Sequence, residues 1–219
     1  HYGGNEAGAR AAVAALPAER VLLVGEDLAE HGAARRLWAR AVDWRGRVDV
    51  VVVNAALNVE TPFEGSDDEW DEGWARTLQV NVIESSSLIR SAVAHFRSSG
   101  GGVLVGVSSW SGQQGSAIPA LSAYAASKAA VKAVIQTVAR AYGRDGVLAY
   151  VVAPGIVRTD MALRNAEGRG GEEAMQARLA LGELVPPEEV GDLVAVLATG
   201  RFRHLTGATV DVNGASYVR

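Results

Sequence analysis

Cysteine is absent from the 219-residue chain, and histidine and aromatic residues are scarce. Without cysteine the chain can form neither disulfides nor thiolate metal sites, as is typical of proteins kept in a reducing compartment. The four histidines (His1, His31, His95 and His204) lie far apart in the sequence, so we expect isolated positions rather than a metal site. These absences favour a metal-free, cytoplasmic protein.

The chain also lacks a dominant charge and a long hydrophobic run. Lys and Arg total 21 against 25 for Asp and Glu, which gives a formal net charge of -4, and no basic stripe stands out. This balance argues against a nucleic-acid partner. The apolar run at 48–57 contains polar residues and is too short to cross a bilayer, and no secretory signal pattern opens the chain. We therefore expect a soluble protein with no membrane partner.

What is present is an alternation of β-branched runs with helix-like segments. Strands buried on both faces are predicted at 21–24, 48–53, 103–107 and 147–152, with a weaker one at 209–212. Helices are predicted at 28–44, 67–97, 123–142 and 187–199. The alternation indicates an α/β fold, a Rossmann-like doubly wound parallel sheet, with residues 1–219 in a single domain. The stretch 164–182, interrupted by Gly168, Gly170 and Gly171, is either a lid or a plain surface loop.

Polar or backbone-exposing residues follow three of the predicted strands. Asn54 comes after the first of them, Ser108 and Ser109 after the second, and Pro154 and Gly155 after the third. Ligands of open α/β sheets bind outside the carboxyl ends of the strands. We therefore expect these residues to cluster around a ligand.

Tyr124 and Lys128 stand four residues apart in a stretch of good helix formers, which places both side chains on one helix face. A nearby ammonium group would lower a tyrosine pKa from its usual value of about 10. Such a tyrosine can exchange a proton near neutral pH. Taken alone, the pair is better explained as a surface tyrosine beside a solvated lysine.

Five motifs in one order give the pair its context. They are VVVNAA at 51–56, LQVNV at 78–82, VGVSS at 105–109, YAASK at 124–128 and VAPGIVRTDM at 152–161. Together they resemble the short-chain dehydrogenase/reductase family, from about residue 2 to the C-terminus. The closing LTGATVDVNGA at 205–215 is most similar to the β-ketoacyl carrier-protein reductase branch.

The resemblance implies a catalytic role for each matching residue. Tyr124 would be the acid that protonates a carbonyl oxygen, and Lys128 would lower its pKa and hold the cofactor ribose. Ser109, three residues before Gly112, would donate a hydrogen bond to the substrate oxygen, with Ser108 and Ser111 as rivals. The interval of 15 residues from Ser109 to Tyr124 is slightly long for the family.

Asn81 has two interpretations. By resemblance it would anchor a water that leads to Lys128. As an ordinary structural amide, it would brace the long predicted helix.

The resemblance also implies cofactor contacts. They fall on Asp27, Leu28, Asn54, Ala55, Tyr124, Lys128, Pro154, Gly155, Ile156 and Thr159. Asp27 and Leu28 would meet the adenine, and the segment from Pro154 to Thr159 the nicotinamide amide. Ala56 replaces a glycine of the family pattern, and its methyl group would crowd the cofactor. Trp110 either lines an apolar substrate pocket or fills the edge of the core.

By the same resemblance, residues 1–219 are an N-terminally incomplete domain. The first strand, the glycine-rich turn that holds the pyrophosphate and the helix after it have no counterpart in the sequence. Their removal would leave apolar strands with unpaired backbone groups. We therefore expect the working protein to possess such a segment.

Two functional hypotheses follow. The first is an NADPH-dependent oxidoreductase, a ketoreductase that transfers hydride to a small-molecule carbonyl or acyl substrate. NADP is favoured over NAD because residues 1–5 show no acidic residue for the ribose hydroxyls of NAD. The second is a truncated, cofactor-independent member that acts as an isomerase or lyase, or as a non-catalytic subunit. The family usually forms homo-oligomers, and we expect a dimer or tetramer through the helices at 67–97 and 123–142.

Overall fold

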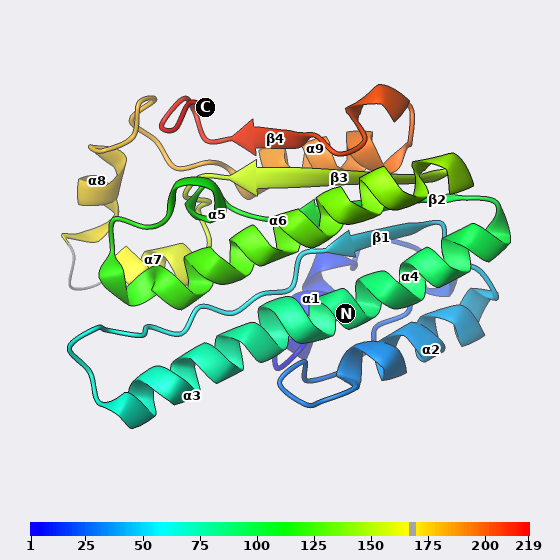
Figure 1. Ribbon diagram of the computed structural model, residues 1–219, viewed down its shortest axis with the longest axis horizontal. Helices are drawn as coiled ribbons and strands as arrows, with labels where there is room; N and C mark the ends of the chain where they lie inside the picture. Colours follow the sequence, from blue (N-terminus) through cyan, green and yellow to red (C-terminus); the bar gives the residue numbers. More distant parts are fainter. Residues whose placement is uncertain (167–169) are drawn as a thin grey trace.

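Four parallel strands form the sheet, in the spatial order β1-β2-β3-β4 (Figure 1). They are β1 (Val50–Val53), β2 (Gly102–Val107), β3 (Val147–Pro154) and β4 (Thr209–Val212). The computed structural model describes residues 1–166 and 170–219. All eight residues of β3 are buried, as expected for a parallel strand covered on both faces.

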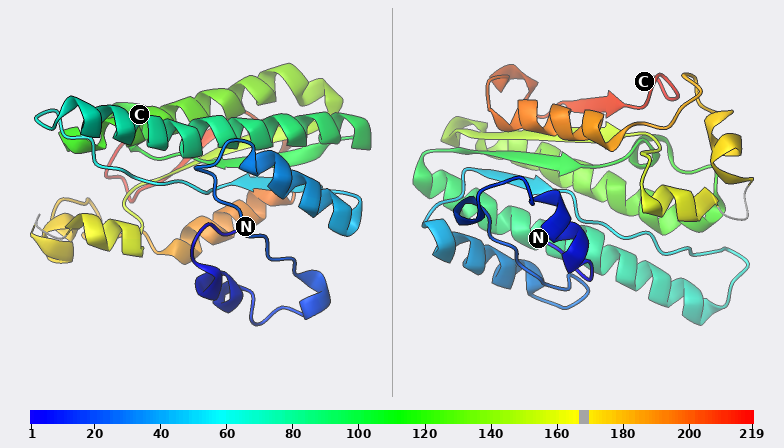
Figure 2. Two further views of the ribbon diagram at one scale, coloured as in Figure 1. Left: turned by 90° about the horizontal axis from the view of Figure 1, so that it is seen from below. Right: turned by 180° about the vertical axis from the view of Figure 1, so that it is seen from behind.

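Nine helices are named within the described ranges. They are α1 (Glu6–Ala12), α2 (Ala33–Arg45), α3 (Asp67–Leu78), α4 (Ser85–Ser99), α5 (Ser111–Gln114), α6 (Ser122–Tyr142), α7 (Asp160–Ala166), α8 (Gly171–Gln176) and α9 (Pro187–Ala198). Figure 2 shows α4 and α6 on one side of the sheet and α9 on the other. The three-layer α/β prediction is confirmed. In this part of the chain no helix is both long and apolar enough to cross a membrane.

The two faces of the sheet carry separate hydrophobic clusters. On one face Leu104 packs with Phe96 of α4 and Ile135 of α6, and all three side chains are fully buried. On the other, Tyr150 packs with Leu197 of α9. Gly106 permits the close approach of α6, because a Cβ atom there would lie 2.7 Å from Cγ1 of Ile135. Burying this apolar surface is the main stabilising contribution to the fold.

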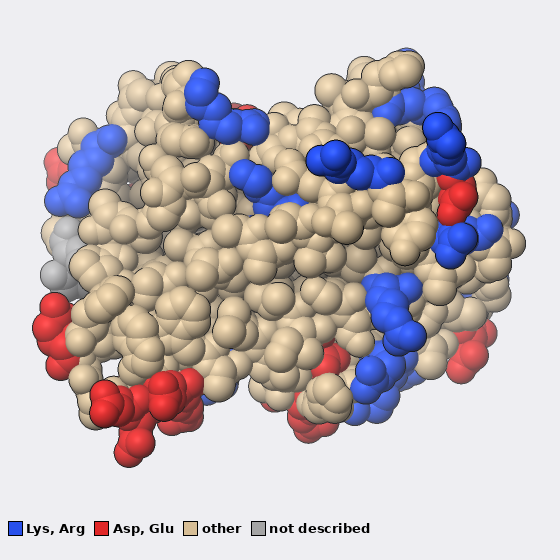
Figure 3. All heavy atoms as spheres, in the orientation of Figure 1, with Lys and Arg blue, Asp and Glu red and all other residues tan. Residues whose placement is uncertain are grey.

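The long helix predicted at 67–97 begins as expected and carries one irregularity. Ser66 caps α3 and forms a reciprocal capping box with Glu69. Acidic side chains gather at this end (Figure 3), where they complement the helix dipole. A π-helical turn, Gln79–Glu84, then joins α3 to α4. Such turns often occur at functional sites.

The predicted strand at 21–24 is wrong. One isolated parallel bridge joins Tyr2 to Gly25, through hydrogen bonds of 3.1 Å from the Tyr2 N–H to the Val24 carbonyl and from the Glu26 N–H to the Tyr2 carbonyl. Within residues 1–166 and 170–219, no second strand continues beside Val21–Val24, so the ladder stops after this bridge. Without a neighbour to complete its backbone pairing, a β-branched run does not become a strand.

The described part of the stretch at 164–182 is not an unstructured loop. It contains the end of α7 and all of α8, and Ala174 and Met175 of α8 line the cavity described below. Gly168 lies outside the described residues.

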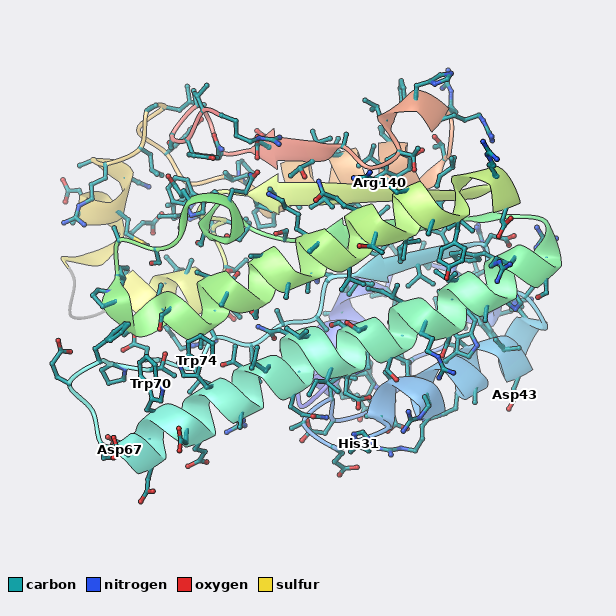
Figure 4. The ribbon with its side chains drawn as sticks, viewed as in Figure 1. His31, Asp43, Asp67, Trp70, Trp74 and Arg140 are labelled. Carbon is teal, nitrogen blue, oxygen red and sulfur yellow. The ribbon has the colours of Figure 1, made fainter. Side chains whose placement is uncertain are left out.

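Glu84, at the end of the π turn, holds the start of α2. Its carboxylate is buried and accepts hydrogen bonds of 2.8 Å from the backbone N–H groups of Gly32 and Ala34. His31, labelled in Figure 4, lies 3.7 Å from the same carboxylate and is exposed. A buried anion at a helix N-terminus satisfies backbone donors that have no partner within the helix.

We expect Glu84→Gln to lower the free energy of unfolding by about 2 kcal/mol, because the amide replaces an acceptor oxygen with a donor and leaves a buried N–H unpaired. Urea denaturation followed by circular dichroism measures the change. Exposed Glu64→Gln serves as the matched control. Equal stability of the two variants would show that the carboxylate does not anchor α2.

Candidate active site

A cavity of about 970 Å³ opens at the carboxyl ends of β1, β2 and β3. Its wall includes Asn54, Ser108 and Pro154 from the three strand ends. The start of α6 and parts of α5, α7, α8 and α9 complete it. The structure therefore brings together the residues that the sequence predicted to cluster.

Tyr124 and Lys128 enter the cavity wall from the first turns of α6. The Lys128 ammonium lies 5.7 Å from the centre of the Tyr124 ring and donates a 2.9 Å hydrogen bond to the carbonyl of Val107. Lys128 is almost completely buried, at 4% exposure. A cationic group is thus held beside the phenol at the floor of the cavity.

Burial shifts the pKa values of both Tyr124 and Lys128. It lowers the pKa of Lys128 to about 8 and raises the pKa of Tyr124 above its ordinary value. A hydrogen bond from Ser109 opposes the rise. The predicted lowering of the Tyr124 pKa by Lys128 is therefore not seen: desolvation dominates, and the Lys128 ammonium is directed to the Val107 carbonyl.

The three candidate serines occupy different environments. Ser108 is buried and donates a 2.8 Å hydrogen bond to the carbonyl of Lys128, so it joins β2 to α6. Ser109 lines the cavity, and its hydroxyl accepts a 3.2 Å hydrogen bond from the N–H of Ser111. The hydroxyls of Ser109 and Ser111 are also 3.2 Å apart. Of the three serines, Ser109 is the one whose hydroxyl acts to lower the pKa of Tyr124.

Gly112 lets α5 approach α6 closely enough to form this cluster. A Cβ atom at Gly112 would lie 2.8 Å from the backbone nitrogen of Ala129 and 2.8 Å from the carbonyl carbon of Lys128. Backbone atoms cannot move aside as a flexible side chain does. A glycine is therefore required where the serine-bearing segment meets the helix of Tyr124 and Lys128.

Asn81 is fully engaged as a brace. Its Oδ1 accepts from the N–H of Leu57, while its Nδ2 donates to the Leu57 carbonyl and to the hydroxyl of Ser127, all at 2.9 Å. Ser127 in turn donates to the carbonyl of Tyr124 at 2.7 Å. The side chain thus links the π turn to the loop after β1 and to α6. A role for Asn81 in anchoring a water toward Lys128 stays a prediction.

The predicted cofactor residues divide into two groups. Six of them line the cavity beside Tyr124 and Lys128: Asn54, Ala55, Pro154, Gly155, Ile156 and Thr159. Asp27 and Leu28 do not, because the Asp27 carboxylate accepts from the N–H of Ala29 and Leu28 packs with Ala33 and Val80. Ala56 and Trp110 also belong to the cavity wall, and substrate contact by Trp110 stays a prediction.

Lys128 fits a nicotinamide ribose. An ammonium group has three donors, and the hydrogen bond to Val107 uses one. The other two are available to hydroxyl groups in the cavity. The donor set on this side therefore suits the sugar of a dinucleotide.

Sequence reasoning missed several residues of the cavity wall, among them Asn58, Ile118, Met175 and Arg178. Asn58 follows the end of the strand predicted at 48–53 by five residues, so the strand-end argument could have included it. Ile118 lies in the loop between Ser109 and Tyr124 whose extra length was noted. Met175 and Arg178 carry no local signal, since α8 reaches the cavity only through the tertiary fold.

A model of the family described as enoyl-(acyl carrier protein) reductase matches residues 2–215. The chain is a short-chain dehydrogenase/reductase. Its fold and strand-end cavity agree with membership of this oxidoreductase family, whose members act on small-molecule substrates.

Individual relatives of this short-chain dehydrogenase/reductase cover most of its length. An L-rhamnose 1-dehydrogenase (NAD(P)(+)) from Sphingomonas sp. (strain SKA58) is 31% identical over 221 residues, which cover 100% of this chain and 85% of the relative. Dehydrogenase/reductase SDR family member 4 from Homo sapiens is 32% identical over 209 residues, covering 94% and 73%.

A solved structure is also similar to the short-chain dehydrogenase/reductase described here. It is a 3-oxoacyl (acyl-carrier-protein) reductase from Agrobacterium tumefaciens C58 with NADP bound. The TM-score is 0.77 at 29% identity, and the match covers 87% of this chain and 72% of that one. This neighbour supports the resemblance to the β-ketoacyl carrier-protein reductase branch.

The buried ammonium of Lys128 makes stability depend on pH. Its pKa is about 8 in the folded protein against an ordinary value of 10.5, so between these values the unfolded chain binds more protons and stability rises with pH. Relative to Lys128→Met, the wild-type protein should gain about 2 kcal/mol of unfolding free energy from about pH 7 to about pH 9.5. Urea denaturation at the two pH values measures the gain, and parallel profiles for the two proteins would contradict it.

Proposed function

We propose that this protein is an NADPH-dependent ketoreductase. The observation that carries the proposal is the convergence of Ser109, Tyr124 and Lys128 on one cavity at the strand ends. The similarity to dehydrogenases and to a 3-oxoacyl (acyl-carrier-protein) reductase supports it. The substrate class is a small molecule with a carbonyl or acyl group.

Each of these side chains has a task that suits its chemistry. Tyr124 holds a phenolic proton at neutral pH, because burial raises its pKa, and it gives this proton to the carbonyl oxygen. Ser109 donates a hydrogen bond to the same oxygen and stabilises the negative charge that develops there. Lys128 positions the ribose through the two donors that its hydrogen bond to Val107 leaves free. A bound nicotinamide supplies hydride to the carbonyl carbon.

We place the nicotinamide half of the cofactor between Asn54, Ala55 and the segment from Pro154 to Thr159, all of which line the cavity. NADP is our choice over NAD. The NADP-bound neighbour supports it, as does the lack of acidic residues at 1–5. Asp27 and Leu28 remain candidates for the adenine end, outside the cavity wall.

We also propose a cytoplasmic homo-oligomer, a dimer or tetramer formed through the long helices. On this part of the surface Ile83 of the π turn is 48% exposed, and Ala133 of α6 is exposed as well. Small and apolar side chains of this kind permit close helix packing.

The sheet itself points to a further strand. β1 is an edge strand in the described chain, yet Val50 and Val52 are 37% and 41% exposed on one of its faces. Exposed apolar edge strands tend to pair with other strands. We propose that residues 1–219 belong to a single domain in which a strand from outside this range pairs with β1 and brings the pyrophosphate-binding turn.

The catalytic assignment predicts distinct outcomes for three substitutions. Tyr124→Phe should lower kcat for ketone reduction by about a hundredfold to ten-thousandfold, because the proton donor is lost. Ser109→Ala should lower it by about a hundredfold or more, since the oxygen loses a donor. Ser111→Ala should keep most of the activity, because the backbone N–H that contacts Ser109 is retained.

The measurement is NADPH oxidation by absorbance, with NADPH binding titrated separately by fluorescence. NADPH binding by Tyr124→Phe with little turnover supports the assignment. If the wild-type protein binds no dinucleotide and reduces no ketone, the ketoreductase proposal is lost and the cofactor-independent alternative takes its place.

The proposed additional strand can be tested by a substitution at Val50. If another segment covers this face, Val50→Ser should lower the free energy of unfolding by about 1–2 kcal/mol, because a buried apolar side chain is replaced by a polar one. Val218, which is 78% exposed, gives the control substitution Val218→Ser. Chemical denaturation compares the two, and an effect at Val50 no larger than the control would mean that the face is solvated.

A further inference from the structure

The charged groups of the cavity wall share one sign. Among the described residues that line it, Lys128 and Arg178 carry charge, and no Asp or Glu does. This contrasts with the chain as a whole, whose formal net charge is -4. A cavity lined by one sign of charge attracts ligands of the opposite sign.

Arg178 has no role within the described part of the protein. No hydrogen bond or ion pair joins its guanidinium to another described residue, although its backbone N–H donates to the carbonyl of Met175. Arg158 shows the contrast, since it forms a 3.1 Å ion pair with Glu172 of α8. A guanidinium left unpaired at a cavity is well suited to bind a carboxylate or phosphate through two parallel hydrogen bonds.

The backbone around Arg178 is fixed in place. Arg178 follows the end of α8, and the N–H of Ala180 donates a 3.0 Å hydrogen bond to the hydroxyl of Ser216 near the C-terminus. The backbone that carries Arg178 into the cavity wall is therefore held to the C-terminal segment, while the Arg178 side chain itself is exposed.

The neighbours of Arg178 in the wall are apolar. Ala174, Met175 and Leu179 flank it along the sequence, and Met161 of α7 lines the same cavity. In Figure 1, α8 lies beyond α5, away from the strand end of β1 that carries Asn54. This wall is thus suited to an apolar chain that leads from the carbonyl site to the cation.

We propose that Arg178 is a specificity-determining residue that binds an anionic group of the substrate, separated from the reacting carbonyl by an apolar spacer. The inference rests on the proposed ketoreductase function and narrows its substrate class to oxo acids and acyl compounds with an anionic tail. The carbonyl lies at Ser109 and Tyr124, the spacer packs on Met175 and Leu179, and Arg178 holds the anion.

The test compares methyl-ketone carboxylic acids of increasing chain length with their methyl esters. These pairs share the carbonyl and spacer and differ in the charge of the tail. Arg178 is exposed, so for the best acid Arg178→Gln should raise KM about fivefold, the upper end of the range for an exposed ion pair. The ester should change less than about twofold. Arg178→Lys should recover part of the affinity, and added salt should weaken binding of the acid more than that of the ester.

The matched control is Arg140→Gln. Arg140 is an exposed arginine of α6 outside the cavity, and Figure 4 places it toward the end of that helix remote from α7 and α8. Its substitution should alter neither substrate. Equal losses for acid and ester in Arg178→Gln would overturn the inference, as would a weaker affinity for NADPH alone, which would assign Arg178 to a cofactor phosphate.

A binding measurement separates this inference from the proposed function. Isothermal titration of the acids and esters, with and without NADPH, reports recognition of the anion even if no ketone is reduced. Failure of turnover with a preserved preference for the acid rejects the ketoreductase and keeps the anion site. Turnover of both compounds without a preference dependent on Arg178 rejects the anion site and keeps the ketoreductase.

Discussion

The carboxamide of Asn81 is the constraint on which the rest of the site depends. Its three hydrogen bonds join the π turn of the long helix to Leu57 after β1 and to Ser127 on α6. Ser127 then holds the backbone of Tyr124. One amide therefore sets the distance between the strand ends and the helix with the reactive side chains. A buried amide with three hydrogen bonds is costly to disturb, which holds these three segments in place beside the cavity.

Much of the fold could be predicted from the sequence because most elements depend on local patterns and burial. The β-branched runs gave all four observed strands, and β4 matches its expected range at 209–212. The run at 21–24 is also apolar and is not a strand, since strand formation also needs a neighbour. Composition predicts which residues can join a sheet, whereas the partners present decide which of them do.

The candidate site was predictable to the extent that it lies at strand ends and on one helix face. Ser109, Tyr124 and Lys128 meet because β2 and α6 lie side by side, and this follows from the α/β alternation. The pKa of Tyr124 was not predictable, because the effect of burial depends on the finished cavity. Arg178 was not predictable either, since nothing near it in sequence shows that α8 folds over the strand ends.

The π turn carries two anchors on different sides of the molecule. Asn81 faces α6 and the loop after β1, and Glu84 faces the start of α2. A π turn holds one residue more than an α-helical turn, so deletion of a single residue there would rotate α4 by about 100° relative to α3. Both anchors would then lose their partners together. The six residues of this turn therefore set the rotation of α4 relative to α3, and their number matters as much as their identity.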